Sequence, residues 1–292
     1  MNMEATKFRL ESRLDAVCRI ARAAGDAILA IYEKGFSVHE KSDASPLTEA
    51  DMASHRIIVA ELAALAPSLP ILSEEGPQEI SFEERSRWET YWLVDPLDGT
   101  RDFIKRNGEF TVNIALIHQG HPLLGVVYVP VGNRTYSAAK GLGAYRWEGD
   151  NQAANDAIPI RVRARAEGPL RILASRSRST RLLDAYLANA GPRFGSHEVV
   201  RVGSSLKFCL IAEGAADLYP QFGPTSEWDT AAAHAIILEA GGAVTDMRFN
   251  PLIYNQKGSL LNPPFFAFGH RDHDWSAFLA NPLAPGIENE RK

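Results

Sequence analysis

Apolar residues recur at helical spacing in several parts of the chain, with polar positions between them. This spacing predicts helices over residues 14–33, 48–65, 180–190, 206–216 and 230–240. Gly35 and the pair Gly241–Gly242 follow two of these stretches, where they are suited to cap a helix C-terminus.

Shorter apolar runs predict strands. The first two, residues 69–72 and 91–94, each end in acids, and a third lies at residues 171–174. Between them, three strands separated by short turns predict an antiparallel meander over residues 111–117, 123–129 and 134–138. The elements together predict a layered α/β fold with mixed and antiparallel sheets.

The stretch from Glu148 to Asp156 is polar and rich in small residues, which predicts a boundary between two lobes. Residues 1–155 would form an α+β lobe carrying most of the candidate metal ligands. Residues 156–292 would form an α/β lobe carrying Asp229 and the segments that recognise substrate.

Composition narrows the class of protein. The 292 residues are 45% hydrophobic and 23% charged, as in an ordinary globular protein. A net charge of −5 disfavours a surface that coats nucleic acid. Two cysteines, Cys18 and Cys209, lie in apolar helical stretches and are expected to be reduced core residues. No secretory signal or membrane-spanning run is evident, so we expect a cytoplasmic protein; peripheral association with the inner face of the cell membrane would leave no clear sequence trace.

Acids concentrate at three places beside apolar elements. Glu74 follows the first strand, Asp95 and Asp98 follow the second, and Asp229 opens the last helix. Each place alone has a structural explanation: a solvated acid, a turn built on Asp95-Pro96-Leu97-Asp98-Gly99, and a helix N-cap. Three such places in one chain make a joint role in binding a cation the better explanation.

Mg²⁺ is held by a few carboxylates together with substrate phosphate. Glu74, Asp95, Asp98 and Asp229 could hold two adjacent ions, with Asp95 between them. The backbone carbonyl of Leu97 adds a further oxygen, and the N–H groups of Gly99 and Thr100 are available to a phosphate.

These motifs resemble the inositol-monophosphatase superfamily. Its signatures stand here as Asp95-Pro96-Leu97-Asp98-Gly99-Thr100-Arg101-Asp102-Phe103 and as Trp228-Asp229-Thr230-Ala231-Ala232 with Gly241-Gly242. Within it, the chain looks most similar to the bacterial 3′(2′),5′-bisphosphate nucleotidases of sulfur assimilation. The likeness runs from Leu14 to Phe268, and its diagnostic stretches are residues 104–113, 203–209 and 218–225.

The resemblance implies a layered sandwich of helices and two sheets, and a hydrolase that depends on two or three Mg²⁺ ions. It implies that Glu74, Asp95 and the Leu97 carbonyl hold one ion. It implies that Asp95, Asp98 and Asp229 hold the second. Thr100 would act with Glu74 and Asp51 to orient the attacking water. Asp51 has a structural alternative as a first-turn acid that stabilises a helix dipole.

A bisphosphate needs a second anion site. Ser204 and Lys207, at i and i+3, would share one face of a helix that starts near Ser205 and could form a phosphate site; the alternative is a helix cap and a lysine that reaches toward solvent. Arg178 stands where the family usually has histidine, and its guanidinium can bind phosphate. Tyr219 and Phe222 are candidates for stacking on adenine.

The sequence therefore predicts a phosphatase that converts 3′-phosphoadenosine 5′-phosphate to AMP plus phosphate. A second candidate substrate is 3′-phosphoadenylyl sulfate, which would give adenylyl sulfate. The predicted partner is a small bisphosphorylated adenine nucleotide. Asp98, Gly99, Thr100, Ser204, Lys207, Arg178 and Asp229 would contact it. Two alternatives stay open: an inositol monophosphatase or other sugar-phosphate phosphatase, and a non-catalytic nucleotide sensor. The sequence does not set the oligomeric state.

Overall fold

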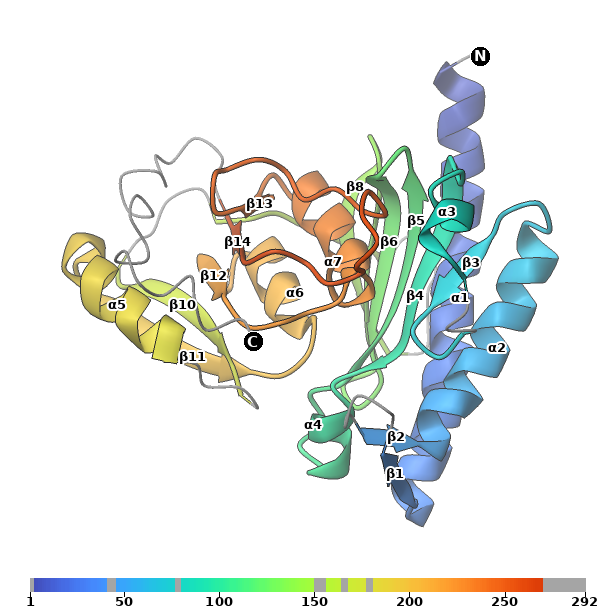
Figure 1. The fold of residues 1–292 in the computed structure, drawn as a ribbon, viewed down its shortest axis with the longest axis horizontal. Coiled ribbons are helices and arrows are strands. Elements are labelled where there is room, and N and C mark those ends of the chain that lie inside the picture. The colour runs from blue at the N-terminus through green and yellow to red at the C-terminus, as the bar shows by residue number, and fades with distance from the viewer. Residues whose placement is uncertain are drawn as a thin grey trace.

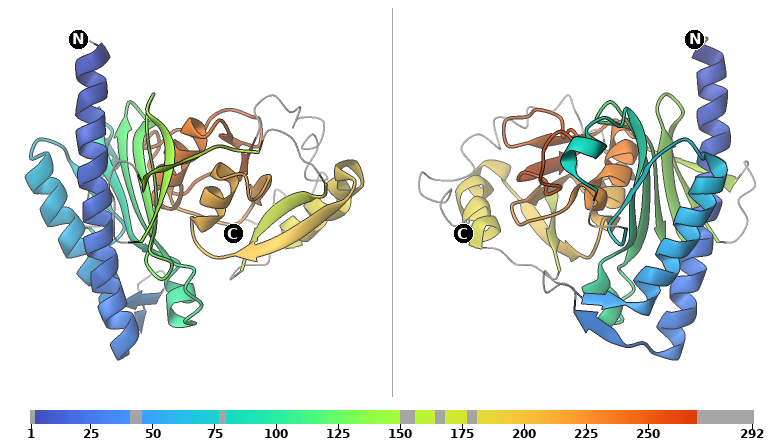
Figure 2. Two further views of the ribbon diagram at one scale, coloured as in Figure 1. Left: turned by 180° about the vertical axis from the view of Figure 1, so that it is seen from behind. Right: turned by 45° about the vertical axis from the view of Figure 1, so that its right-hand side comes forward.

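The computed structural model describes residues 3–40, 46–76, 80–149, 156–163, 168–176 and 181–269. Helices and sheets alternate in layers, as Figures 1 and 2 show. The helices are α1 (Met3–Lys34), α2 (Glu49–Leu65), α3 (Phe82–Arg85), α4 (Thr100–Ile104), α5 (Arg181–Phe194), α6 (Leu206–Ala212) and α7 (Glu227–Glu239).

The first sheet has seven strands in the order β3-β4-β5-β6-β7-β8-β9. Its strands are β3 (Ile71–Ser73), β4 (Thr90–Asp98), β5 (Thr111–His118), β6 (His121–Val129), β7 (Arg134–Ala139), β8 (Gly143–Glu148) and β9 (Ile158–Ile160). β3 and β4 are parallel, and every later pair is antiparallel. A separate ribbon pairs β1 (Val38–Glu40) with β2 (Pro46–Thr48).

Both faces of this sheet are buried, which explains why its strands are continuously apolar. On β4, Trp92 and Val94 belong to the core formed with α1 and α2. Tyr91 and Leu93, which alternate with them, belong to the core formed with α6 and α7. The sheet thus separates two cores, with α1 and α2 on one side and α6 and α7 on the other (Figure 1).

Helix α7 lies unusually close to the sheet. A Cβ atom added to Gly125 on β6 would come within 2.0 Å of the Ala232 carbonyl oxygen. The glycine and the small residues of α7 therefore let two backbones approach directly. This contact fixes α7 on β6, two strands from β4 in the same sheet.

The second sheet has five strands in the order β11-β10-β12-β14-β13. Its strands are β10 (Leu170–Ser175), β11 (His197–Val202), β12 (Leu218–Gln221), β13 (Ala243–Asp246) and β14 (Phe265–Phe268). β10 is parallel to β11 and β12, and the other pairs are antiparallel. Apolar residues of α5 such as Leu183 and Tyr186 pack on its outer face in a third core.

The predicted layered fold with mixed sheets is confirmed, but several boundaries differ. Helix α1 begins at Met3 rather than Leu14. Helix α6 ends at Ala212 rather than Ala216, because Gly214 takes a positive φ of 77° that a helix cannot continue through. Most of the predicted lobe boundary, residues 148–156, lies outside the described residues, so the division into lobes stays a prediction. Strand β9, which follows this boundary, pairs with β8 of the first sheet.

Cys18 and Cys209 are both buried and unbridged, as expected of core cysteines. Burial raises the pKa of the Cys18 thiol to about 12. Across the residues that the structure describes, no helix combines the length and the apolar character needed to cross a membrane.

Candidate active site

A cavity of about 400 Å³ brings together segments that lie far apart in the sequence. Its wall includes the end of β3, the end of β4, the start of α4, the loop before α6 and the start of α7. The predicted site residues that line it are Glu74, Asp95, Leu97, Asp98, Gly99, Thr100, Ser204, Lys207 and Asp229.

The acidic motif lies within β4 as a bulge. The turn that the sequence suggested for this motif, after the end of the strand, is therefore wrong. Asp95 pairs with Asn113 and Asp98 pairs with Thr111, so two residues of β4 have no partner between them. Pro96 has no N–H to give to a ladder, and in a central strand it is tolerated only at such a bulge. The bulge places Asp95, Leu97 and Asp98 on the wall of the same cavity.

Asp95 lies at the electrostatic centre of the acids. It is only 1% exposed. Burial raises its pKa well above the usual value, and the nearby Glu74, Asp98 and Asp229 raise it further. A divalent cation among these groups would oppose that shift, since it would stabilise the charged form.

The donor set fits a hard divalent cation, since it consists of carboxylates with the Leu97 carbonyl nearby. The acids line one cavity without forming a compact cage. Within the described ranges, no three His, Cys, Asp or Glu side chains come close enough to hold an ion. A bound ion would therefore have to draw the acids together or complete its shell with other oxygens, as Mg²⁺ does with water and phosphate.

Asp51 reaches the site through Thr100. It is the third residue of α2, and its Oδ2 accepts hydrogen bonds from the Thr48 N–H at 2.7 Å and the Thr48 hydroxyl at 2.6 Å. Its Oδ1 accepts one from the Thr100 hydroxyl at 3.2 Å. One Asp51 oxygen thus completes a capping box and the other accepts from Thr100, while its role in orienting water stays a prediction.

Asp229 is held in the same way. Helix α7 begins at Glu227 rather than Thr230, with Ser226 as its N-cap, so Asp229 is the third helical residue and not the cap. The Ser226 N–H donates to Asp229 Oδ2 at 2.9 Å and closes a capping box. This bond fixes the Asp229 carboxylate at the wall of the cavity.

Ser204 and Lys207 line the cavity, but not as two residues on one helical face. Ser205 is the N-cap of α6, and Ser204 precedes it with a left-handed φ of 45°. The buried Lys207 ammonium donates to the carbonyls of Ser204 at 2.5 Å and Val202 at 3.3 Å. Burial lowers its pKa, while Asp98 and Asp102 oppose the shift most among its acidic neighbours.

The loop before α6 is also bonded to the acids. The Ser205 N–H donates to Asp98 Oδ2 at 2.5 Å. The Ser205 hydroxyl bonds to Asn113 Oδ1 and to the Thr111 hydroxyl, both at 2.8 Å. Sequence reasoning missed these partners, although Thr111 and Asn113 end one of the stretches that carry the family resemblance. Burial raises the pKa of Asp98, whereas Lys207 and the Ser205 N–H lower it.

The two candidate stacking aromatics lie in different places. Tyr219 lines the cavity, and its ring centroid lies 5.0 Å from the Lys207 ammonium. Phe222 is buried in the third core against Tyr186 and is not among the residues that line the cavity. Arg178 lies outside the described residues. Apolar residues that sequence reasoning did not identify complete the lining: Phe208, Pro224, Trp228, Leu261 and Phe265.

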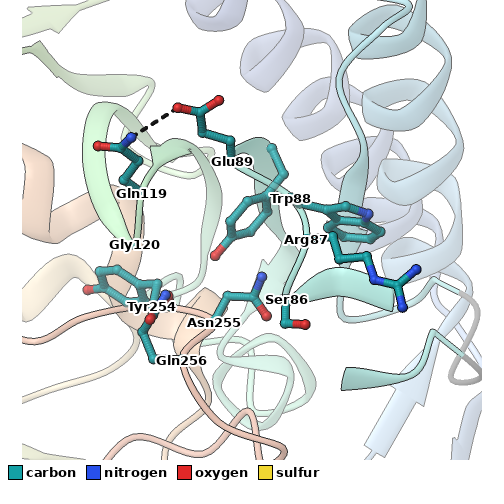
Figure 3. A pocket seen from close by; sticks show the side chains of 10 residues that line it. Ser86, Arg87, Trp88, Glu89, Gln119, Gly120, Tyr254, Asn255 and Gln256 are labelled. Carbon is teal, nitrogen blue, oxygen red and sulfur yellow. Dashed lines mark hydrogen bonds between the residues drawn. The ribbon is translucent and has the colours of Figure 1, made fainter. Parts of the chain in front are cut away.

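A second, smaller cavity of about 250 Å³ lies at another place on the molecule (Figure 3). Trp88, Gln119 and Asn255 line it from three separate segments, and the Gln119 amide donates to Glu89 at 3.0 Å. Glu89 is the one acid among the described residues that line this cavity. The larger cavity is therefore the better candidate for metal-assisted chemistry.

Comparison with known proteins agrees with this site. The family model described as "Inositol monophosphatase family" matches residues 9–275. The 3′(2′),5′-bisphosphate nucleotidase CysQ of Shigella flexneri is 50% identical over 256 residues, covering 86% of this chain and 98% of the relative. The CysQ of Escherichia coli strain K12 is 49% identical over 254 residues, with the same coverage.

Solved structures show the same likeness. The crystal structure of CysQ from Bacteroides thetaiotaomicron, described as a bacterial member of the inositol monophosphatase family, matches with a TM-score of 0.79 and 43% identity over 89% of this chain and 98% of that one. An IMPase from Thermotoga maritima matches with a TM-score of 0.74 and 26% identity over 92% and 97%. The likeness expected from the motifs is confirmed, and this chain belongs to the inositol monophosphatase family.

Proposed function

We propose that the protein is a 3′(2′),5′-bisphosphate nucleotidase that removes the 3′-phosphate of 3′-phosphoadenosine 5′-phosphate to give AMP and phosphate. One observation carries the proposal: a single cavity combines the four carboxylates proposed as metal ligands with a buried lysine and an apolar wall. The relatives named as bisphosphate nucleotidases, at about half identity over most of the chain, support it. 3′-Phosphoadenylyl sulfate, which carries the same 3′-phosphate, is a second candidate substrate.

The proposed cofactor is Mg²⁺, bound as two or three ions. Glu74, Asp95 and the Leu97 carbonyl would hold one ion, and Asp98 and Asp229 would join Asp95 in holding another. When bound, such ions supply Lewis acidity to the phosphoryl group and to the leaving oxygen. Hydroxide generated from water suffices as nucleophile, so no covalent phosphoenzyme is required.

Thr100 and Asp51 are proposed to orient the attacking water together with Glu74. The Thr100 hydroxyl donates to the buried Asp51 carboxylate, so its oxygen can accept a hydrogen bond from water. This series of hydrogen bonds, from water to Thr100 to Asp51, directs a lone pair of the water toward phosphorus and gives the departing proton a path to a carboxylate. The N–H groups of Gly99 and Thr100, at the start of α4, are proposed to contact the phosphate that is cleaved.

The remaining wall is proposed to hold the rest of the nucleotide. Lys207 and Ser204 would bind the 5′-phosphate, with Arg178 as a further anion contact. A nucleoside has an apolar base that an inositol lacks, and Pro224, Trp228 and Leu261 offer an apolar surface within the same cavity. The large exposed fraction of Leu261, 50%, is consistent with a surface that a ligand covers.

Phosphate release from a substrate panel tests the proposal. The panel contains 3′-phosphoadenosine 5′-phosphate, its 2′ isomer, inositol 1-phosphate and fructose 1,6-bisphosphate, each at equal Mg²⁺. We expect the highest kcat/KM for the adenine nucleotides. Preference for inositol 1-phosphate would identify a sugar-phosphate phosphatase, and binding without turnover would identify a nucleotide sensor.

The expected cytoplasmic location stays a prediction.

Replacing Lys207 with alanine should separate bisphosphate from monophosphate substrates. The change removes one charge-assisted contact, and we expect kcat/KM for 3′-phosphoadenosine 5′-phosphate to fall about tenfold to a hundredfold. Adenosine 3′-monophosphate lacks the 5′ group, so its kcat/KM should change far less. The loss should appear mainly in KM if the contact is equal in the ground and transition states. Equal losses on both substrates would instead assign Lys207 to the support of the loop through its bonds to Ser204 and Val202.

A further inference from the structure

The carboxylate of Glu109 joins three segments at the edge of the candidate site. Glu109 belongs to the turn between α4 and β5. Its Oε1 and Oε2 accept hydrogen bonds from the Arg176 guanidinium at 2.6 and 2.7 Å, immediately after β10. Its Oε2 also accepts the Gly203 N–H at 2.7 Å, in the loop before α6. One side chain of the N-terminal half thus holds two loops of the C-terminal half.

Gly203 begins the loop that carries the proposed 5′-phosphate contacts. A Cβ atom at this position would come within 2.6 Å of Asp102 Oδ2 and 2.8 Å of the Glu109 carbonyl oxygen, so the loop backbone is pressed against the turn. Ser204 follows in a left-handed conformation, and the Lys207 ammonium is bonded to its carbonyl. A shift at Gly203 would therefore move Ser204 and the lysine that depends on it.

The ion pair also fixes the end of β10. The Arg176 guanidinium donates to the carbonyl of Arg201 at 2.8 Å as well as to Glu109. Arg176 comes two residues before Arg178, the other proposed anion contact. The Glu109 carboxylate is thus attached both to the end of β10 and to the loop before α6.

Stability alone is a weak explanation for this arrangement. The side chains of Arg176 and Glu109 are 44% and 22% exposed, so solvent screens what this ion pair adds to the free energy of folding. The bidentate pair fixes the direction in which the Glu109 carboxylate points. The third hydrogen bond, from the Gly203 N–H, then fixes the position of the loop backbone relative to that carboxylate.

We propose that Glu109 is a positioning residue that sets the loop of residues 203–207 for the phosphate that is not cleaved. The proposal rests on the proposed nucleotidase function. It assigns specificity for a bisphosphate to a residue that is not among those lining the cavity. Glu109 need not touch substrate, and its contribution appears only through Ser204 and Lys207.

The test is the variant Glu109→Gln, assayed with 3′-phosphoadenosine 5′-phosphate and with adenosine 3′-monophosphate. An amide presents one acceptor oxygen, so it cannot accept from both nitrogens of Arg176 and from Gly203. We expect KM for the bisphosphate to rise about tenfold to a hundredfold, as misplacement of a binding group allows, with kcat nearly unchanged. The kinetic constants for the monophosphate should change far less, because Ser205, the loop residue that bonds to Asp98, is also held by Asn113 and Thr111.

Glu198→Gln is the matched control. Glu198 pairs with Arg171 at 2.8 Å across the neighbouring strands β10 and β11, and both of its side chains are exposed. The control should leave both substrates unaffected. Glu109→Asp keeps the charge but shortens the reach, and it should show the same selective rise in KM, which provides a second variant if the glutamine protein does not fold.

Three results would overturn the proposal: equal losses on both substrates, an unchanged KM for the bisphosphate, or the same change in Glu198→Gln. Failure of the proposed function is a different result, because the wild-type protein would then show no preference for the bisphosphate over inositol 1-phosphate.

Discussion

Treatment with a chelator is expected to abolish phosphate release, by roughly a thousandfold or more, because the Lewis acidity of metal ions is worth several kcal/mol of transition-state stabilisation. Addition of Mg²⁺ should restore activity. Ca²⁺ should not restore it, because calcium accepts looser and larger coordination shells than an in-line phosphoryl transfer tolerates.

The control for this experiment is the fold of the chelated protein. The proposed metal ligands come from the end of β3, from β4 and from α7, which are held by core packing and, at the start of α7, by a capping box rather than by an ion. Circular dichroism of the chelated protein should therefore match that of the Mg²⁺-loaded protein. Full activity in the folded, metal-free protein would refute the metal-dependent mechanism.

Replacing Asp95 with asparagine is expected to lower kcat/KM by about a hundredfold to a thousandfold while the protein stays folded. Asp95 is the buried centre of the acids and is proposed to contact more than one ion, so its neutralisation weakens the whole site. Phosphate-release kinetics at saturating Mg²⁺ measure the effect.

Thermal unfolding of the same variant is a second measurement, in which the variant should be no less stable than the wild type although its activity is lower. Burial and the neighbouring acids raise the pKa of Asp95 in the folded protein, so at pH 7, above the carboxyl's unfolded pKa, this group costs the metal-free fold stability. Asparagine removes this cost, and we expect the Tm of the metal-free variant to equal or exceed that of the wild type. The rise in Tm that Mg²⁺ produces should shrink, because weaker binding stabilises less.

Asp184→Asn, an exposed acid on α5, is the matched control and should change neither activity nor the response to Mg²⁺. A variant Asp95→Asn with near wild-type turnover would make Asp95 a residue of the bulge only.

The sequence was sufficient to locate the acids, because each lies at the end of an apolar element. Glu74 follows a short buried strand, and Asp229 precedes the alanine-rich part of a buried helix. The end of β4 was placed too early because Pro96 reads as a breaker, whereas the strand continues across it through a bulge. Such a bulge depends on the partner strand, which local patterns do not describe.

The loop before α6 could not be predicted from local patterns for the same reason. Ser204 adopts a positive φ that is unfavourable for serine, and long-range bonds hold the loop around it. Glu109 bonds to Gly203 across 94 positions of sequence, and Ser205 bonds to Asp98 across 107. Spacing alone suggested a helical pair of Ser204 and Lys207, and it gave no sign of the turn that holds them.

The contact between Gly125 and Ala232 gives the proposed metal site its dimensions. Asp95 and Asp98 belong to the sheet, and Asp229 belongs to the helix that touches it backbone to backbone. The span between the strand acids and the helix acid therefore follows from how closely two main chains approach, and not from any side chain within the site. Changes in the cavity lining can alter which ester is accepted while the backbone distance between the strand and the helix is inherited from the core.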